Sequence, residues 1–331
     1  MQTQSKSFIV ATALSTATFL QAAEDHLVFE PSGQSNGKHV VLVAGDEEYR
    51  SEESMPMLGQ VLANNGFKAT VIFSLDKDGN VDPHKGGSLS HSTSLDEADA
   101  IVMCIRFRHW ADADMQRFEN ALNRGVPMTA LRTSTHAFNF KKGSKWEKYN
   151  TRAAKSTGWE KGFGRQVLGE SWVNHHGKHK KQGTRTHLEE ANATHPVLNG
   201  VGTIFCTSDV YGANPLQPST VLLRGAVTES LDPNSKDIDG PKNNPMVPVA
   251  WVREFDNTSD KNNRIMTTTM GASTDLLDEN LRRLVINGVF WGLEMDVPAK
   301  ADVAISDTWK PSPFSFKDYK KGLKPADFIV Q

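Results

Sequence analysis

The chain has 331 residues, of which 38% are hydrophobic and 23% are charged. This balance is ordinary for a globular protein, and the length fits one large α/β domain or two small ones. The formal net charge of −2 excludes a global field that would draw the protein to nucleic acid or to an anionic membrane. We therefore expect no nucleic-acid partner.

The first 23 residues have the pattern of a secretory signal peptide. Lys6 precedes an apolar run at residues 8–14, and small residues then lead to Ala22 and Ala23. The run is too short for a membrane-spanning helix. We expect export to the periplasm or the medium, and no membrane span. The alternative is a buried N-terminal helix, for which residues 15–18 offer a poor apolar stripe.

Residues 39–45 form a continuous apolar run that ends in glycine, which predicts a buried parallel strand. A helix follows, because apolar residues recur at helical spacing until Asn65 and Gly66 end it. Residues 67–73 predict the next strand. This β-α-β order predicts a right-handed crossover and a parallel sheet.

The rest of the chain continues this alternation with one interruption, an insertion at about residues 141–200. The expected strands are at residues 98–107, 126–131, 220–228, 247–253 and 264–269. The expected helices are at residues 112–124, 137–138 and 279–293. A tail rich in Lys and Pro, residues 296–331, is expected to wrap the surface or to fray.

Polar side chains follow four of these strands at their carboxyl ends, where open parallel sheets bind ligands. They are Asp46, Glu47 and Glu48 after the first strand, Arg106 and Arg108 after the third, Arg132, Thr133 and His136 after the fourth, and Ser273 and Asp275 after the last. The mixed charges predict a ligand with several hydrogen-bonding groups. A sugar fits, because carboxylates and guanidinium groups bind hydroxyls and carbonyls well.

Four of these residues are candidates for catalysis. His136 or Glu48 would act as the acid or base, and Arg106 and Arg132 would hold or polarise a carbonyl. The candidates for ligand binding are Asp46, Glu47, Arg108, Thr133, His176, Asp209, Ser273 and Asp275.

Each cluster also has a structural alternative. Glu47 and Glu48 could face a helix macrodipole. Arg106 and Arg108 could be paired surface residues. The run from Ser273 to Asp275 could cap the last helix.

The insertion carries a group of histidines. His175 and His179 are four residues apart, a spacing that on a helix suits zinc or another divalent metal. Gly177 between them disfavours a helix, and no Glu separates them as in a metalloprotease motif. The alternative is that one histidine lines a pocket and the others are solvated. A divalent metal is the one cofactor that the sequence suggests.

Several familiar chemistries are missing from the sequence. No phosphate-binding loop, dinucleotide fingerprint or Gly-x-Ser-x-Gly elbow occurs. Cys104 and Cys206 lie in apolar runs, so we interpret them as small buried hydrophobic residues, although an exported chain could pair them.

Several segments together resemble the ThuA-like (trehalose-utilisation) family of the class I glutamine amidotransferase-like superfamily. They are residues 40–50, 125–136, 195–200 and 264–291. The motifs at residues 172–177 and 268–275 are similar to the version in exported proteins of planctomycete-type bacteria. The resemblance covers residues 38–295 between the signal peptide, residues 1–23, and the tail. It implies a flavodoxin-like three-layer sandwich with a mainly parallel sheet.

The resemblance also implies a link to disaccharide use, including 3-keto sugars. Amidotransferases of the superfamily place a nucleophilic Cys where this chain has Arg132, so a Cys-His-Glu triad and glutaminase activity are excluded. We predict an exported protein that binds or acts on a sugar or keto-sugar, as a hydrolase, lyase or isomerase if it is an enzyme. The alternatives are a non-catalytic carbohydrate-binding module and a zinc-dependent hydrolase that uses His175 and His179. The substrate and the oligomeric state stay open.

Overall fold

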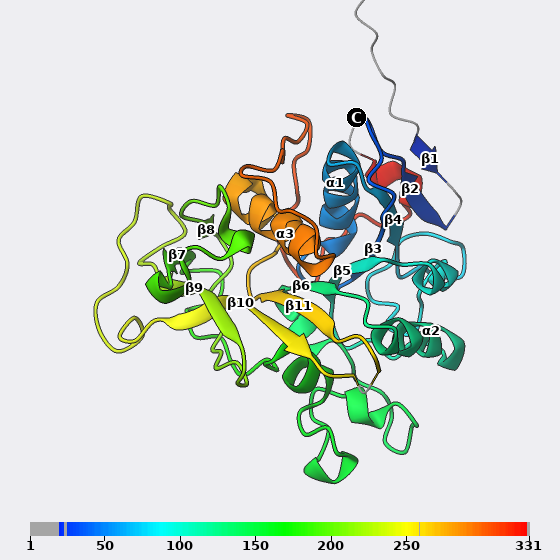
Figure 1. Ribbon diagram of the computed structural model, residues 1–331, viewed down its shortest axis with the longest axis horizontal. Coiled ribbons are helices and arrows are strands. Elements are labelled where there is room, and N and C mark those ends of the chain that lie inside the picture. The colour runs from blue at the N-terminus through cyan, green and yellow to red at the C-terminus, as the bar shows by residue number, and fades with distance from the viewer. Residues whose placement is uncertain (1–19, 23–24, 258, 330–331) are drawn as a thin grey trace, which may run out of the picture.

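Figure 1 shows a computed structural model of the chain, which describes residues 20–22, 25–257 and 259–329. The signal peptide predicted at residues 1–23 lies outside these ranges, except for the short strand Leu20–Ala22. None of the helices in the described ranges has the length and hydrophobicity needed to cross a bilayer.

A single mixed sheet of 11 strands runs through the described part of the chain, in the order β1-β2-β4-β3-β5-β6-β11-β10-β9-β7-β8. The strands are β1 (Leu20–Ala22), β2 (His26–Phe29), β3 (His39–Gly45), β4 (Lys68–Ile72), β5 (Ala100–Ile105), β6 (Met128–Leu131), β7 (Thr184–Leu188), β8 (Phe205–Cys206), β9 (Thr220–Val227), β10 (Val247–Phe255) and β11 (Asn263–Thr268). The central strands β4, β3, β5, β6 and β11 are parallel, as the crossover pattern predicts. Both flanks are antiparallel, so the sheet is less purely parallel than expected.

In the described ranges, three longer helices cover the two faces of the sheet: α1 (Ser51–Asn64), α2 (Asp112–Asn123) and α3 (Glu279–Gly292). α1 and α3 lie on one side and α2 on the other (Figure 1). Successive residues of a strand face opposite sides. Val40 and Leu42 of β3 therefore pack into the core beneath α1 and α3, whereas Val41 and Val43 pack into the core beneath α2. This three-layer α/β arrangement is the fold class that the sequence predicts.

The insertion, residues 141–200, packs against the sheet and extends it, because β7 pairs with β9. Its π-helical turn Gly164–Leu168 approaches the strand-to-helix turn after β6 so closely that a Cβ on Gly164 would lie 2.0 Å from the carbonyl oxygen of Thr135. The neighbouring Phe163 is buried and packs edge-on against Phe118 of α2. A close approach of this kind requires glycine.

The tail wraps the carboxyl edge of the sheet rather than fraying. The Glu53 carboxylate of α1 accepts hydrogen bonds from the backbone N and the Oγ of Ser312, at 2.6 and 2.7 Å. The backbone N of Ser315 donates to the carbonyl oxygen of Glu48 at 2.8 Å. Phe314 packs on the ring of Tyr49 with centroids 5.1 Å apart. These contacts place the tail over the loop that follows β3.

Two local expectations are wrong. The short helix expected at residues 137–138 is instead a 3-10 helix at Arg132–His136, directly after β6. The cap of α3 is Asp278, whose carboxylate accepts from the backbone N atoms of Asn280 and Leu281, and not the run that ends at Asp275. Both cysteines are free and buried, as interpreted.

Candidate active site

The carboxyl ends of β3, β5 and β6 are neighbours, and a cavity of about 170 Å³ lies there. We call it the strand-end cavity. Its walls carry ionisable groups together with aromatic rings, and they are Glu48, Arg106, Phe107, His136, Trp172, His175, His179, Tyr211 and Phe316. The cavity thus unites three predicted catalytic residues with both predicted metal ligands.

A larger, open hollow of about 660 Å³ lies between residues 75–88 and His109. The carboxylate of Asp76 there is occupied by the backbone N atoms of Asp78 and Asn80, at 2.9 and 2.8 Å. The smaller cavity brings together side chains that follow β3, β5 and β6 with the histidines of the insertion, so we take it as the candidate active site.

The loop after β3 is held by the buried carboxylate of Asp46. It accepts from the backbone N atoms of Glu48 and Tyr49, both at 2.6 Å, and from the hydroxyl of Thr133. Burial and the neighbouring Glu47 raise the pKa of Asp46 to about 6. Asp46 and Thr133 tie this loop to the turn after β6, and neither lines the cavity.

Glu47 binds two arginines from the end of β5. It forms ion pairs with Arg106 and, at 2.8 Å, with Arg108. Arg108 is buried and also donates to the carbonyl oxygen of Pro83 at 2.9 Å, so it anchors Glu47. Arg106 lines the cavity, and its guanidinium lies 4.6 Å from the ring centroid of Phe107. Of the two arginines, Arg106 is the one that a ligand can reach.

Arg132 begins the sharp turn after β6 and is fully buried. It donates to the carbonyl oxygens of Asp209 and Thr269 at 2.7 and 2.8 Å, and it pairs with the Asp209 carboxylate at 3.1 Å. Its guanidinium also stacks on Tyr211, 3.7 Å from the ring centroid. Arg132 therefore lies beneath the cavity wall and positions other groups.

Two cavity-side residues have strained backbones. Phe107 has a φ of 48° and Arg132 a φ of 45°, values that cost free energy for residues other than glycine. Such strain concentrates at functional sites, where the surrounding structure maintains it. At Arg132 it turns the chain sharply, so that His136 faces the cavity.

His136 is buried among rings, with its centroid 5.1 Å from that of Phe107 and 5.6 Å from that of Trp172. Burial lowers its pKa well below 6.5, and the charges of Arg106 and Arg132 act in the same direction. The imidazole is therefore neutral at physiological pH.

Asp209 joins the histidines of the insertion to the site. Its two carboxylate oxygens lie 2.8 Å from Nδ1 of His175 and 2.9 Å from Nδ1 of His179. Nε2 of His179 lies 3.2 Å from the Glu48 carboxylate. Hydrogen bonds to Asp209 and Glu48 raise the pKa of His179 to about 9. His179 therefore links two carboxylates and carries a positive charge at neutral pH.

Three of these groups have the donor set of a metal site. Potential ligand atoms of His175, His179 and Asp209 lie within 4.8 Å of one another. Two imidazoles and one carboxylate suit zinc. The two histidines lie on an irregular turn and not on the shared helical face that the spacing suggested.

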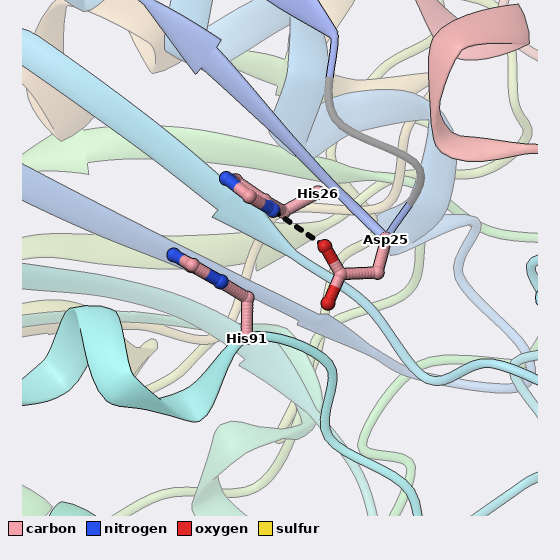
Figure 2. Close-up of side chains that lie close together, drawn as sticks. All are labelled: Asp25, His26 and His91. Atoms are coloured by element: carbon pink, nitrogen blue, oxygen red, sulfur yellow. Dashed lines mark hydrogen bonds and ion pairs between the residues drawn. The ribbon is translucent and has the colours of Figure 1, made fainter.

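A second group of potential ligands, Asp25, His26 and His91, lies between β2 and the loop before residue 92. Figure 2 shows the two imidazoles stacked face to face. Their centroids are 3.6 Å apart and their planes are 8° apart. Ring nitrogens bind metals in the plane of the ring, so parallel stacked rings do not aim at one ion. Asp25 instead pairs with Nδ1 of His26 at 2.6 Å.

Three predicted ligand-binding residues make structural contacts away from the cavity. Nε2 of His176 contacts the carbonyl oxygen of Lys242 at 2.7 Å. The hydroxyl of Ser273 donates to the carbonyl oxygen of Ser312 at 3.1 Å. The buried Asp275 carboxylate accepts from Ser208 and from the backbone that follows β11.

The aromatic wall is the part of the site that sequence reasoning missed: Phe107, Trp172, Tyr211 and Phe316. Trp172 is the first residue of the motif at residues 172–177, and Tyr211 follows the candidate Asp209 by two residues. Both therefore lie next to residues that the sequence already indicated. Phe316 comes from the tail, and no pattern there indicates a site.

Comparison with known proteins gives a family. The family model ThuA, described as trehalose utilisation, matches residues 39–292. A search of curated proteins gave no match.

A search of solved structures gave two proteins described as ThuA-like. The one from Parabacteroides merdae ATCC 43184 is 14% identical, over 77% of this chain and 90% of that chain, with a TM-score of 0.49. The one from Bacteroides uniformis ATCC 8492 is 15% identical, over 78% and 91%, with a TM-score of 0.47. An exo-beta-1,4-mannosidase from Opitutaceae bacterium strain TAV5 is 10% identical, over 79% of this chain and 36% of that chain, with a TM-score of 0.34.

Proposed function

We propose, from the premise that this chain belongs to the ThuA (trehalose utilisation) family, that its strand-end cavity binds and acts on one ring of a sugar or keto-sugar. The family indicates a carbohydrate-related role. The proposal adds the place, the size of the ligand and the residues that act on it.

The observation that carries the proposal is the composition of the cavity wall. Aromatic rings, such as that of Trp172, offer flat apolar surfaces to the C–H face of a sugar. Glu48 and Arg106 offer an acceptor and donors to hydroxyl or carbonyl oxygens. The volume of about 170 Å³ is below the roughly 300–1,000 Å³ of clefts for drug-sized ligands. One sugar ring is therefore a better fit than a disaccharide.

The same geometry suits proton transfer beside a carbonyl. In a keto-sugar, Arg106 would stabilise the negative charge that develops on the carbonyl oxygen. Glu48 would accept a proton from the adjacent carbon as that C–H bond breaks, and the protonated His179, which is 3.2 Å from Glu48, would donate a proton to the carbonyl oxygen, so that an enol forms. The neutral His136 would orient a hydroxyl by hydrogen bonding. Asp209 positions the imidazoles of His175 and His179, and Arg132 holds Asp209 from beneath.

The thiols and the turn after β6 support the absence of glutaminase activity. Arg132 occupies the turn where amidotransferases of the superfamily carry a cysteine. Burial raises the pKa of both thiols, Cys104 and Cys206, so neither is a ready nucleophile.

The proposal is tested by proton exchange in a keto-sugar, followed by NMR in deuterated buffer. A methyl 3-keto-glucoside should exchange the proton beside its carbonyl faster with the wild-type protein than without it, and Arg106→Gln should remove most of this acceleration. Arg117→Gln on α2, which removes a surface ion pair with Asp96, serves as the matched control. Binding without exchange would favour a non-catalytic binding module. The absence of both binding and exchange would contradict the proposal.

The donor set of His175, His179 and Asp209 favours a second candidate, a zinc-dependent hydrolase. A bound divalent ion would supply Lewis-acid activation at the cavity wall. Calorimetric titration with zinc should then show one site, which the double variant His175→Ala/His179→Ala loses. An active preparation that is free of metal would rule this candidate out.

We also propose that the protein is exported, on the pattern of residues 1–23. N-terminal sequencing of the protein from its natural host should find a start near Ala23. A mature chain that begins at Met1 would contradict export by this route.

A further inference from the structure

The part of the insertion next to the cavity is strongly basic. Residues 141–161 contain six Lys and one Arg against two Glu, a net charge of +5 in a chain whose total is −2. A local concentration of one charge raises the local concentration of ligands of the opposite charge.

A hollow of about 380 Å³ lies in this segment, and we call it the basic hollow. Trp172 borders both the basic hollow and the strand-end cavity. The other residues around it are Thr151, Arg152, Ala153, Ala154, Lys155, Glu160, Lys161, Ser171 and Val173. Trp172 is therefore the side chain at which the two cavities adjoin.

The cations around the basic hollow lack protein partners. The side chains of Arg152, Lys155 and Lys161 are all exposed. Within the described parts of the chain, none of the three makes a hydrogen bond or an ion pair. Other lysines of the segment do have partners: Lys145 pairs with Asp112 at 3.4 Å and Lys148 with Glu119 at 2.9 Å. The unpaired positive charges of the segment therefore lie around the basic hollow, which adjoins the strand-end cavity at Trp172.

We propose that the basic hollow is a second subsite, which takes a carboxylate- or sulfate-bearing unit of a glycan whose neighbouring ring occupies the strand-end cavity. This inference rests on the proposed function. It makes an anionic glycan the preferred ligand, whereas a single neutral sugar ring occupies the strand-end cavity alone. Exposed ion pairs are individually weak and are screened by salt, so three cations acting together fit a weak, salt-sensitive contribution to specificity.

Two pairs of charge reversals distinguish the effect of the cations in the basic hollow from the effect of the net charge of the segment. Lys155→Glu/Lys161→Glu reverses two cations of the hollow. Lys141→Glu/Lys142→Glu makes the same change in net charge on two exposed lysines of the same segment that do not line it. The probes are dextran sulfate, polygalacturonate and neutral dextran, and affinity electrophoresis at low and at physiological salt measures their Kd.

We expect dextran sulfate or polygalacturonate to bind the wild-type protein more tightly than dextran does. The first pair of reversals should weaken this binding by about tenfold, and the second by less than about twofold. Trp172→Ala should weaken it as well, because Trp172 joins the two sites. The two polyanions distinguish sulfate from carboxylate as the preferred group.

Three results would overturn the second subsite. They are equal losses from both pairs of reversals, no binding of either polyanion, and binding of a single-stranded DNA oligonucleotide as tight as that of the polysaccharides. A separate titration with the neutral methyl 3-keto-glucoside distinguishes a failure of the second subsite from a failure of the proposed function. If the wild-type protein binds that sugar but neither polyanion, only the subsite fails. If polyanions bind but the neutral sugar does not, the proposed function fails.

Discussion

Replacing Asp209 by Asn would remove the carboxylate charge that pairs directly with the fully buried Arg132. The side chains of Asp209 and Arg132 have exposed fractions of 0%, and their charged atoms lie 3.1 Å apart. Breaking a buried ion pair by removing one partner costs about 3–5 kcal/mol, because the other charge stays buried without compensation. Asn keeps the shape and one acceptor, so we expect a loss of about 3 kcal/mol in the free energy of unfolding.

The matched control is Asp237→Asn. Asp237 also pairs with an arginine and a histidine, Arg185 and His187, but its side chain is 28% exposed. Such a pair contributes about 0–1 kcal/mol. Urea denaturation with linear extrapolation measures both variants.

A second readout follows the histidines by NMR titration. The hydrogen bond to Asp209 is the first cause of the raised pKa of His179, so this pKa should fall from about 9 towards 6.5 in Asp209→Asn. The pKa of Asp209 itself is lowered: burial alone would raise it, but hydrogen bonds from His175 and His179 and the charge of Arg132 outweigh burial. A loss no larger than that of Asp237→Asn, with an unchanged His179 pKa, would refute this account of the site.

Other predictions concern pH and packing. Among the described residues, neither carboxylate oxygen of Glu52 has a hydrogen-bond partner, and burial raises the pKa of Glu52 from 4.5 to about 8. Its contribution to stability is full below pH 4.5 and is lost as the pH rises through about 8, by up to about 1.4 kcal/mol per pH unit. Urea midpoints measured across this range should therefore change less in Glu52→Gln, and parallel curves would count against the buried proton. His179 contributes stability that is full below pH 6.5 and is lost as the pH rises through about 9, so His179→Gln should flatten the alkaline side of the stability curve. Gly164→Ala should cost about 1–3 kcal/mol because its Cβ meets the Thr135 carbonyl oxygen at 2.0 Å, whereas Gly33→Ala, with no atom within 4 Å, should be nearly neutral; equal melting temperatures would contradict this packing.

The central strands and the long helices could be predicted because their signals are local. The strand at residues 39–45 is apolar throughout, and both of its faces are covered by helices. β2 was missed because four residues are too few to show a pattern. The antiparallel flanks follow from pairings over long sequence distances, as when β7 of the insertion joins β9.

The candidate site was predicted where topology alone decides position. Parallel strands deliver their following residues to one edge, which brought Glu48, Arg106 and His136 together. The burial of Arg132 could not be predicted, because it depends on Asp209, 77 positions further along the chain. The approach of Phe316 likewise depends on how the tail folds back, which no periodicity encodes.

A crystal structure of the protein soaked with a methyl 3-keto-glucoside tests the central claim most directly. The account predicts one sugar ring in the strand-end cavity, stacked on Trp172, with its carbonyl oxygen facing the guanidinium of Arg106 and a hydroxyl near Glu48. A sugar bound elsewhere, such as in the larger hollow beside residues 75–88, or an empty cavity at saturating ligand, would contradict it.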